Sequence, residues 1–189
     1  MLTISYLWLL LGGPSPPVQV FAVDPVHHFI SFTVQHFSVG KVRARFNEAG
    51  GHIAFDPEAL ADFHMELTID AASLDTADRD RDAGLISPFW LDAEKHPRIA
   101  FTSKSLAKTA DGYMVTGDFN LRGMTKEIRF PLQINGPVKD PLGKERLGLE
   151  AHFEIDRTEF GMTFSKTMVD GGPFVGKVLV VEVLIEAIR

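Results

Sequence analysis

"VDPVHHFISFTVQHF", residues 23–37, is the stretch that decides the fold class. Apolar and polar side chains alternate through its second half. One face therefore carries four residues: Ile30, Phe32, Val34 and His36. A period of two is typical of a β-strand with one buried face. The stretch predicts an antiparallel β-protein in which these four side chains point toward the interior.

The same period recurs along the chain and gives about eight strands in total. Alternation returns at residues 41–55, 63–69, 99–103, 113–121, 128–134, 147–155 and 177–188, and "AGG" at 49–51 is expected to bend the first of these. Most connections are short and rich in Gly, Pro, Asp and Asn, as in hairpins. A closed barrel is favoured over a sandwich because closure removes the edge strands. A barrel of this size holds its own side chains or one elongated ligand, and periodicity does not separate the two.

One segment, residues 73–97, breaks the alternation. "SLDTADRDRDAGLISPFWLDAEKHP" starts with a Ser/Asp/Thr cluster of the capping type and carries charges at helical spacing. We predict a long insertion with one or two short helical turns. Its aromatic pair, Phe89 and Trp90, is expected to close one end of the barrel, either as a plug or as a gate.

Composition narrows the function classes. At 189 residues the chain fits one domain with a sizeable core. A net charge of −6, with no basic run longer than a pair, argues against nucleic acid and anionic membrane surfaces as partners. The absence of cysteine excludes disulfides, thiolate zinc sites and cysteine nucleophiles. Fifteen Phe against two Tyr and two Trp indicate a large apolar interior that is filled or lined.

The first twenty residues differ from the rest. An apolar stretch at 4–11 is followed by a Gly/Pro break, and it is too short to span a bilayer. We interpret residues 1–20 as a leader or signal-like segment, the alternative being an ordinary tail, and residues 21–189 as the barrel. This predicts a periplasmic or secreted protein with no integral membrane span.

Five stretches in order carry a family resemblance. They are the Asp24-to-His36 segment, "RARFNEAGGHIAFDP", "ASLDTADRDRDAGLISPFWLDAEKHPRIAFTSKS", "VTGDFNLRGMTKEI" and "AHFEIDRTEFGM". Together they resemble the YceI-like family of polyisoprenoid-binding, lipocalin-like proteins over nearly all of residues 21–189. The chain departs from the pattern at residues 84–87, where "GLIS" replaces a common His-Leu-Arg-Ser. An imidazole and a guanidinium that relatives carry are therefore missing from the loop.

The resemblance implies an all-β fold, namely an extended antiparallel lipocalin-like β-barrel of about eight strands around an apolar tunnel. It implies non-catalytic binding or transport of a long isoprenoid lipid, of polyprenyl or quinone type, without a cofactor. Burial of such a tail at roughly 25 cal/mol per Å² supplies enough driving force without polar contacts. Two alternatives stay open: a side-chain-filled periplasmic stress or interaction protein, and a small barrel enzyme that pairs His36 with a carboxylate. The sequence has no nucleophile elbow, phosphate loop or HExxH motif.

The candidate ligand-binding residues come from the inward faces, the long insertion and one strand end. They are Ile30, Phe32, Val34, His36, Phe46, Phe89, Trp90, Phe101, Phe119, Phe153 and Arg157. His36 is interpreted either as a structural histidine bonded to a buried carbonyl or as a head-group contact. Arg157 is a candidate for a phosphate or carbonyl contact, or an end-of-strand side chain that reaches solvent. Arg81 and Asp82 either belong to a solvated, self-paired face or anchor the insertion over the barrel mouth.

No metal site is predicted. His28 and His36 lie eight residues apart, about 27 Å along a strand, which is too far to share an ion. His27 has only Asp24 nearby, and we interpret this pair as a lock at the start of the strand. The final apolar run, "VLVVEVLIEAI", is apolar on both faces. It indicates either pairing inside the barrel or cover by a second surface, which leaves a homodimer open.

Overall fold

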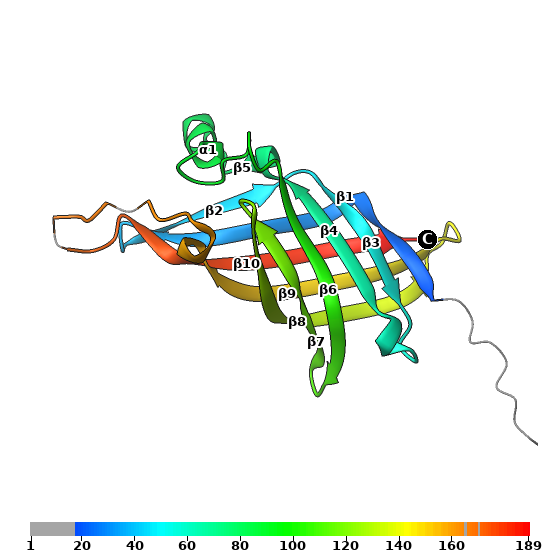
Figure 1. The fold of residues 1–189 in the computed structure, drawn as a ribbon. Coiled ribbons are helices and arrows are strands. Elements are labelled where there is room, and N and C mark those ends of the chain that lie inside the picture. Colours follow the sequence, from blue (N-terminus) through cyan, green and yellow to red (C-terminus); the bar gives the residue numbers. More distant parts are fainter. Residues whose placement is uncertain (1–17, 165, 170) are drawn as a thin grey trace, which may run out of the picture.

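The structure, a computed structural model, describes residues 18–164, 166–169 and 171–189 (Figure 1). Ten strands occur in this part of the chain: β1 (Gln19–His36), β2 (Gly40–Phe46), β3 (Ala49–Phe55), β4 (His64–Asp70), β5 (Leu74–Asp75), β6 (Arg98–Thr109), β7 (Gly112–Leu121), β8 (Met124–Lys139), β9 (Glu145–Asp156) and β10 (Val175–Ile188). The helices there are α1 (Arg79–Ile86) and the short 3₁₀ turns η1 (Leu60–Asp62), η2 (Ala71–Ser73) and η3 (Arg157–Phe160).

Eight strands close into a barrel within the described part of the chain. Each of β1, β3, β4, β6, β7, β8, β9 and β10 pairs antiparallel with its neighbour, and β10 pairs back onto β1. The register of this last ladder sets Phe32 opposite Val181 and Val34 opposite Leu179. The predicted fold class, an all-β antiparallel barrel of about eight strands with one partly helical insertion, is confirmed. The final apolar run is therefore β10, hydrogen-bonded to β1 and β9.

β2 and β3 follow one line along β1, as the alternation over residues 41–55 predicts. β2 pairs with the second half of β1 and β3 with its start, and residues 47–48 interrupt them. The predicted bend at residues 49–51 also depends on Gly51, because most other residues do not adopt its φ of 148°. A Cβ at Gly51 would lie 1.9 Å from the carbonyl oxygen of Glu66 on β4, so only glycine lets the two strands approach there.

The inward face follows the predicted alternation. Ile30, Val34, Phe46 and Phe101 are buried, whereas Phe32, Phe119 and Phe153 are half-buried although they face the interior. One end of the barrel is packed solid by side chains with almost no exposure: Phe21, Ile53, Phe55, Val115 and Leu147. Packing therefore closes one end and becomes looser along the barrel.

The insertion folds back onto the barrel. The side chain of Asp78 caps α1 by accepting from the Arg81 amide at 3.0 Å. After α1 the chain turns, and the amides of Leu91 and Ala93 donate to the carbonyls of Leu85 and Ile86. Leu91 and Ala93 are buried, so the segment is a fixed flank of the barrel.

Most of the leader-like segment, residues 1–17, lies outside the described residues. β1 begins at Gln19, and Gln19 and Val20 pair with Phe55 and Ala54 of β3. The barrel therefore starts two residues before the predicted boundary at residue 21. Among the described residues, no helix combines the length and the apolar character that crossing a bilayer requires.

The adjacent glycines of β3 give a matched test of the close approach. Gly51→Ala is expected to lower the free energy of unfolding by about 2 kcal/mol or more, because the new Cβ meets backbone and the φ is strained. Gly50→Ala meets nothing within 4 Å and should leave stability unchanged or raise it by up to about 1 kcal/mol. Urea unfolding of both variants measures the difference, and equal effects would contradict the assignment.

Candidate functional site

An elongated cavity of about 350 Å³ runs inside the barrel. Its wall is almost entirely aliphatic and aromatic, and its volume falls in the range of small-molecule sites. Ten of the eleven candidate residues lie in the lining: Ile30, Phe32, Val34, His36, Phe46, Trp90, Phe101, Phe119, Phe153 and Arg157. The cavity explains why inward-facing phenylalanines are only half-buried. The barrel is not filled by its own side chains.

The cavity is long and narrow. Along β10 its lining extends from Val175 to Ile185, a path of about 33 Å at the usual rise of a strand. Two rings of its wall, Phe130 and Phe153, stack with centroids 4.3 Å apart. The shape suits an extended chain better than a compact molecule.

The two ends of the cavity differ. At the end where β1 turns into β2, the lining consists of half-buried rings: His36, Trp90, Phe164 and Phe174. The ring of Trp90 lies 5.7 Å from that of Phe164, and His36 lies 5.6 Å from Phe174. The opposite end is the solid core around Phe21 and Leu147. Access to the cavity is therefore from the β1–β2 end, which we call the open end.

Phe89 is the candidate residue that the structure places outside the lining. Its side chain is 71% exposed and contacts Phe164 at 6.4 Å between centroids. A tight turn explains the difference, because the Trp90 amide donates to the Ser87 carbonyl and aims Trp90 inward while Phe89 points away. The expectation that both aromatics close the barrel end is corrected: Trp90 lines the cavity and Phe89 flanks the opening.

Arg157 enters the barrel because β9 ends in a capped turn. The carboxylate of Asp156 accepts from the amide and hydroxyl of Thr158, which winds the chain into η3 and directs Arg157 inward. The residue is only 1% exposed. Its guanidinium carbon lies 4.9 Å from the ring centroid of Trp90, a cation–π contact. Burial lowers the pKa of this guanidinium, and the neighbouring Asp156 opposes the change.

The donors of Arg157 are committed to the chain itself. Nε donates to the Gly176 carbonyl at 2.8 Å, Nη2 to the Val175 carbonyl at 3.2 Å and Nη1 to the Met162 carbonyl. Arg157 therefore ties the start of β10 and the residue Met162 to the end of β9. These bonds and the stacking on Trp90 are structural roles, and the contact of Arg157 with a phosphate or carbonyl of a ligand stays a prediction.

Two other polar residues of the lining have different roles. Arg81 donates from Nε to the Thr76 hydroxyl at 2.8 Å and from Nη2 to the Thr76 carbonyl, while Asp82 accepts from the Thr76 amide and hydroxyl. These bonds hold α1 to the residue after β5, within the insertion itself, so they do not decide between the two interpretations of this charged pair. The carbonyl of His36 accepts from the Val39 amide, whereas its ring nitrogens make no hydrogen bond with a described residue and remain free for another partner at the open end.

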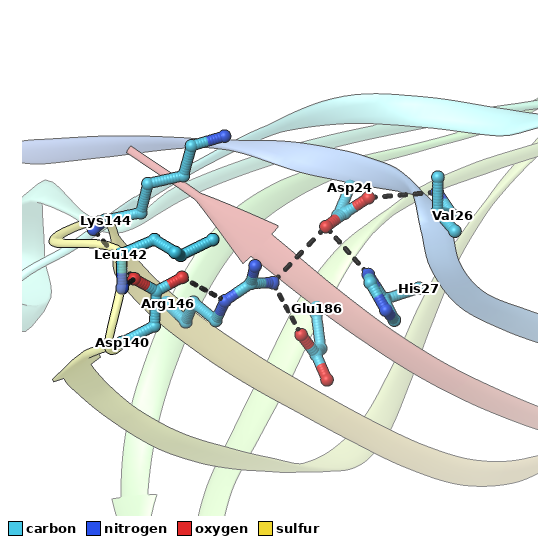
Figure 2. A network of polar contacts seen from close by, with 8 residues as sticks. All are labelled: Asp24, Val26, His27, Asp140, Leu142, Lys144, Arg146 and Glu186. Atoms are coloured by element: carbon cyan, nitrogen blue, oxygen red, sulfur yellow. Dashed lines mark hydrogen bonds and ion pairs between the residues drawn. The ribbon is translucent and has the colours of Figure 1, made fainter.

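A polar network joins three strands at the packed end (Figure 2). Asp24 is buried and accepts from the Val26 amide at 3.0 Å, and His27 Nδ1 lies 2.9 Å from the other carboxylate oxygen. The predicted Asp24–His27 lock is thus present. Arg146 of β9 completes it, with Nη1 3.3 Å from Asp24 and 2.9 Å from Glu186 of β10.

The network explains an irregularity of β1. Register between β1 and β10 shifts between Val23 and His28, so the residues in between form a bulge. Asp24 holds this bulge to β9 through Arg146, whose Nε also lies 2.9 Å from Asp140. Sequence reasoning missed Arg146, Glu186 and Asp140, which lie more than a hundred residues after Asp24 and share no local pattern with it.

The same network contains the metal-capable group of the described chain. Asp24, His27 and Glu186 each offer a ligand atom, and these atoms lie within 4.8 Å of one another. The guanidinium of Arg146 already bridges both carboxylates and supplies the positive charge. An ion would have to displace it, so the geometry supports a salt-bridge network.

The sequence of the chain is similar to a known protein family and to individual members of it. Residues 21–187 match a family model described as a YceI-like domain. The chain is similar to a UPF0312 protein of Photorhabdus laumondii, with 35% identity over 154 residues and 80% of each chain covered.

Two solved structures are similar in fold. Burkholderia cenocepacia BcnA aligns with a TM-score of 0.73 and 22% identity, covering 87% of this chain and 99% of that one. A polyisoprenoid binding domain from Saccharophagus degradans aligns with a TM-score of 0.62 and 14% identity, covering 88% and 97%. At these identities the likeness shows the fold.

The Asp24 network predicts a pH dependence of stability. The Val26 amide, then His27 and Arg146, lower the pKa of Asp24 from its usual 3.8 to about 2. Since the folded-state pKa lies below the unfolded one, the stabilisation is fully present above pH 3.8 and is lost as the pH falls through about 2. Asp24→Asn should therefore be less stable than the wild type near neutral pH, and the gap should narrow across this acid range. Urea unfolding over a pH series measures it. The exposed Asp62→Asn is the control, and a constant gap would contradict the prediction.

Arg157 predicts a local effect on the segment before β10. Arg157→Met keeps an apolar stem but leaves three carbonyls without their donor, and should lower the free energy of unfolding by about 3 kcal/mol. Limited proteolysis should then cut first between Met162 and Gly176. Arg129→Met, which changes an exposed arginine of β8, should leave both readouts unchanged. Identical behaviour of the two variants would contradict the tie.

Proposed function

The chain belongs to the YceI-like family, and we propose from this membership and from its cavity that it binds the tail of a long isoprenoid lipid, of polyprenyl or quinone type, inside the barrel. The observation that carries the proposal is the continuous apolar lining along β10 from Val175 to Ile185. A tail of comparable length can lie extended in it, with its end against the packed core.

The energetics favour an apolar ligand. Each 400 Å² of tail surface removed from water contributes about 10 kcal/mol at roughly 25 cal/mol per Å², before the cost of ordering the tail. The two arginines of the lining, Arg81 and Arg157, donate to the chain itself, and the ring of His36, whose nitrogens have no described partner, lies at the open end rather than along the tail. Affinity then depends on the length and width of the tail.

The head group of the ligand would remain at the open end. The ring nitrogens of His36, which lies there, have no partner among the described residues, and this ring contacts those of Phe37 and Phe174. A quinone carbonyl or a phosphate could accept a hydrogen bond from it. The Saccharophagus degradans neighbour is described as a polyisoprenoid binding domain, and its shared fold is consistent with this mode.

Binding is preferred over the two rival functions on structural grounds. An unfilled cavity speaks against a barrel that only packs its own side chains. The described lining contains no Asp or Glu, so His36 has no carboxylate there to act with as a general base. Residues 1–20 resemble a leader segment, and on this ground we propose that the protein binds its ligand in the periplasm or another extracytoplasmic compartment.

The direct test is native mass spectrometry of protein purified without detergent, followed by extraction and lipid analysis. A stoichiometric adduct identified as a polyprenyl or quinone species is the expected result. Protein that stays apo after incubation with such lipids would overturn the proposal.

Neighbouring residues of β10 supply a matched pair of variants. Val181 lines the cavity, whereas Val180 points outward and is exposed. Val181→Trp should occupy the cavity and weaken retention of a prenyl lipid at least tenfold, because the ring takes the place of the tail. Val180→Trp should bind as the wild type does. Equal retention by both variants, with folding verified by circular dichroism, would show that the lipid lies elsewhere.

A further inference from the structure

At the open end two segments of the chain project beyond the barrel (Figure 1), and because they carry exposed apolar side chains we call them the apolar tip. It consists of the β1–β2 turn, residues 37–39, and the segment at residues 166–169 and 171–174. The two parts are joined, since the Phe37 amide donates to the Phe174 carbonyl at 3.1 Å and their rings meet edge to face at 4.5 Å. The amide of Phe174 in turn donates to the Lys166 carbonyl, which folds the second part back on itself.

The tip presents large apolar side chains to solvent. Val39 is 90% exposed and Val169 is fully exposed, and Phe37 is also partly exposed. Phe37 and Ser38 both adopt positive φ, 51° and 58°, in a turn where Asn and Gly are the residues that fit without strain. The chain thus holds apolar residues in a strained turn. Asn or Gly at these positions would relieve the backbone strain and would make the surface more polar. Exposed apolar groups of this kind mark interaction surfaces.

Charge distinguishes the tip from the rest of the molecule. Residues 36–42 and 161–178 contain three lysines, Lys41, Lys166 and Lys177, against a single acidic residue in sequence, although the whole chain has a net charge of −6. All three lysines are exposed, and none forms an ion pair with a described residue. Apolar side chains with lysines behind them are the pattern of proteins that rest on anionic lipid surfaces.

The tip is continuous with the cavity. His36 and Phe174 belong to the cavity lining, and each directly adjoins the tip. Phe89 and Phe164 extend the apolar surface on the other side of the opening. A tail that leaves the cavity therefore emerges among apolar side chains rather than into water.

We propose that the apolar tip docks onto a lipid bilayer that contains anionic lipids, with Val39 and Val169 entering the interface and the three lysines contacting head groups. The open end then faces the membrane, and a tail can pass between bilayer and barrel with little exposure to water. The net charge of −6, which argued against anionic membrane surfaces for the chain as a whole, belongs to the remaining surface, so the proposal revises that expectation for the tip alone. This inference goes beyond the proposed ligand, because docking is measured on vesicles that contain no isoprenoid.

The test is co-flotation with vesicles of phosphatidylcholine and phosphatidylglycerol, and with vesicles of phosphatidylcholine alone. Wild-type protein should float with the mixed vesicles, and binding should fall as salt is added. The double variant Val39→Asp/Val169→Asp should reduce the bound fraction at least tenfold, because it places two carboxylates at the interface. Lys41→Gln/Lys166→Gln should weaken binding to the mixed vesicles and reduce its salt dependence.

The opposite end of the barrel supplies the control. Val138 and Leu142, in and after β8, are 61% and 85% exposed, so Val138→Asp/Leu142→Asp changes the net charge equally without touching the tip. This variant should float as the wild type does. Absence of flotation by the wild type, or equal losses in both double variants, would overturn the docking surface. Native mass spectrometry of each variant separates this result from a failure of the proposed function, which would leave the cavity empty whatever the vesicles show.

Discussion

The antiparallel ladder between β1 and β10 is the interaction on which the rest of the barrel depends. Every other neighbouring pair of strands joins segments close in the chain, whereas Ser31 and Glu182, which face each other here, are 151 residues apart. Without this ladder the same strands would form an open sheet with two free edges and an exposed apolar face. The entropy of closing so long a loop grows only slowly with length, so a long continuous ladder can offset it. An ion pair between Arg43 and Glu182 reinforces the seam on the outside.

Alternation predicted the part of the site that lies on regular strands. Side chains in a strand alternate strictly, so one buried position such as Ile30 determines that Phe32, Val34 and His36 also point inward. The same logic cannot separate Phe89 from Trp90, because a turn held by a single backbone hydrogen bond decides which aromatic enters. Arg157 is predicted as a ligand contact or a solvent-reaching side chain at a strand end, yet its partners are carbonyls at Met162 and at the start of β10, which no periodicity of β9 encodes. The Arg146 network was missed because it joins residues that only closure of the barrel brings together.

Arg146 and Arg157 stabilise opposite ends of the barrel by different means. Arg146 balances three carboxylates at the packed end, where polar groups can meet without reaching the cavity. Arg157 instead satisfies backbone carbonyls at the open end and covers its face with Trp90. An unpaired carboxylate beside the cavity would oppose entry of an apolar tail, since buried charge is costly without a partner. The arrangement keeps the ion pairs away from the path that an apolar ligand takes.

The half-buried phenylalanines along the cavity have a consequence for the lifetime of the protein. Rings that face empty space forgo the dispersion contacts of a packed core, so the empty barrel is less stable than its strand count suggests. The proposed lipid would bind the folded barrel and not the unfolded chain, and would add about 2.7 kcal/mol when its concentration is a hundred times the dissociation constant. Loaded molecules would then resist proteolysis longer than empty ones. The abundance of such a carrier would follow the supply of its cargo without any dedicated regulator.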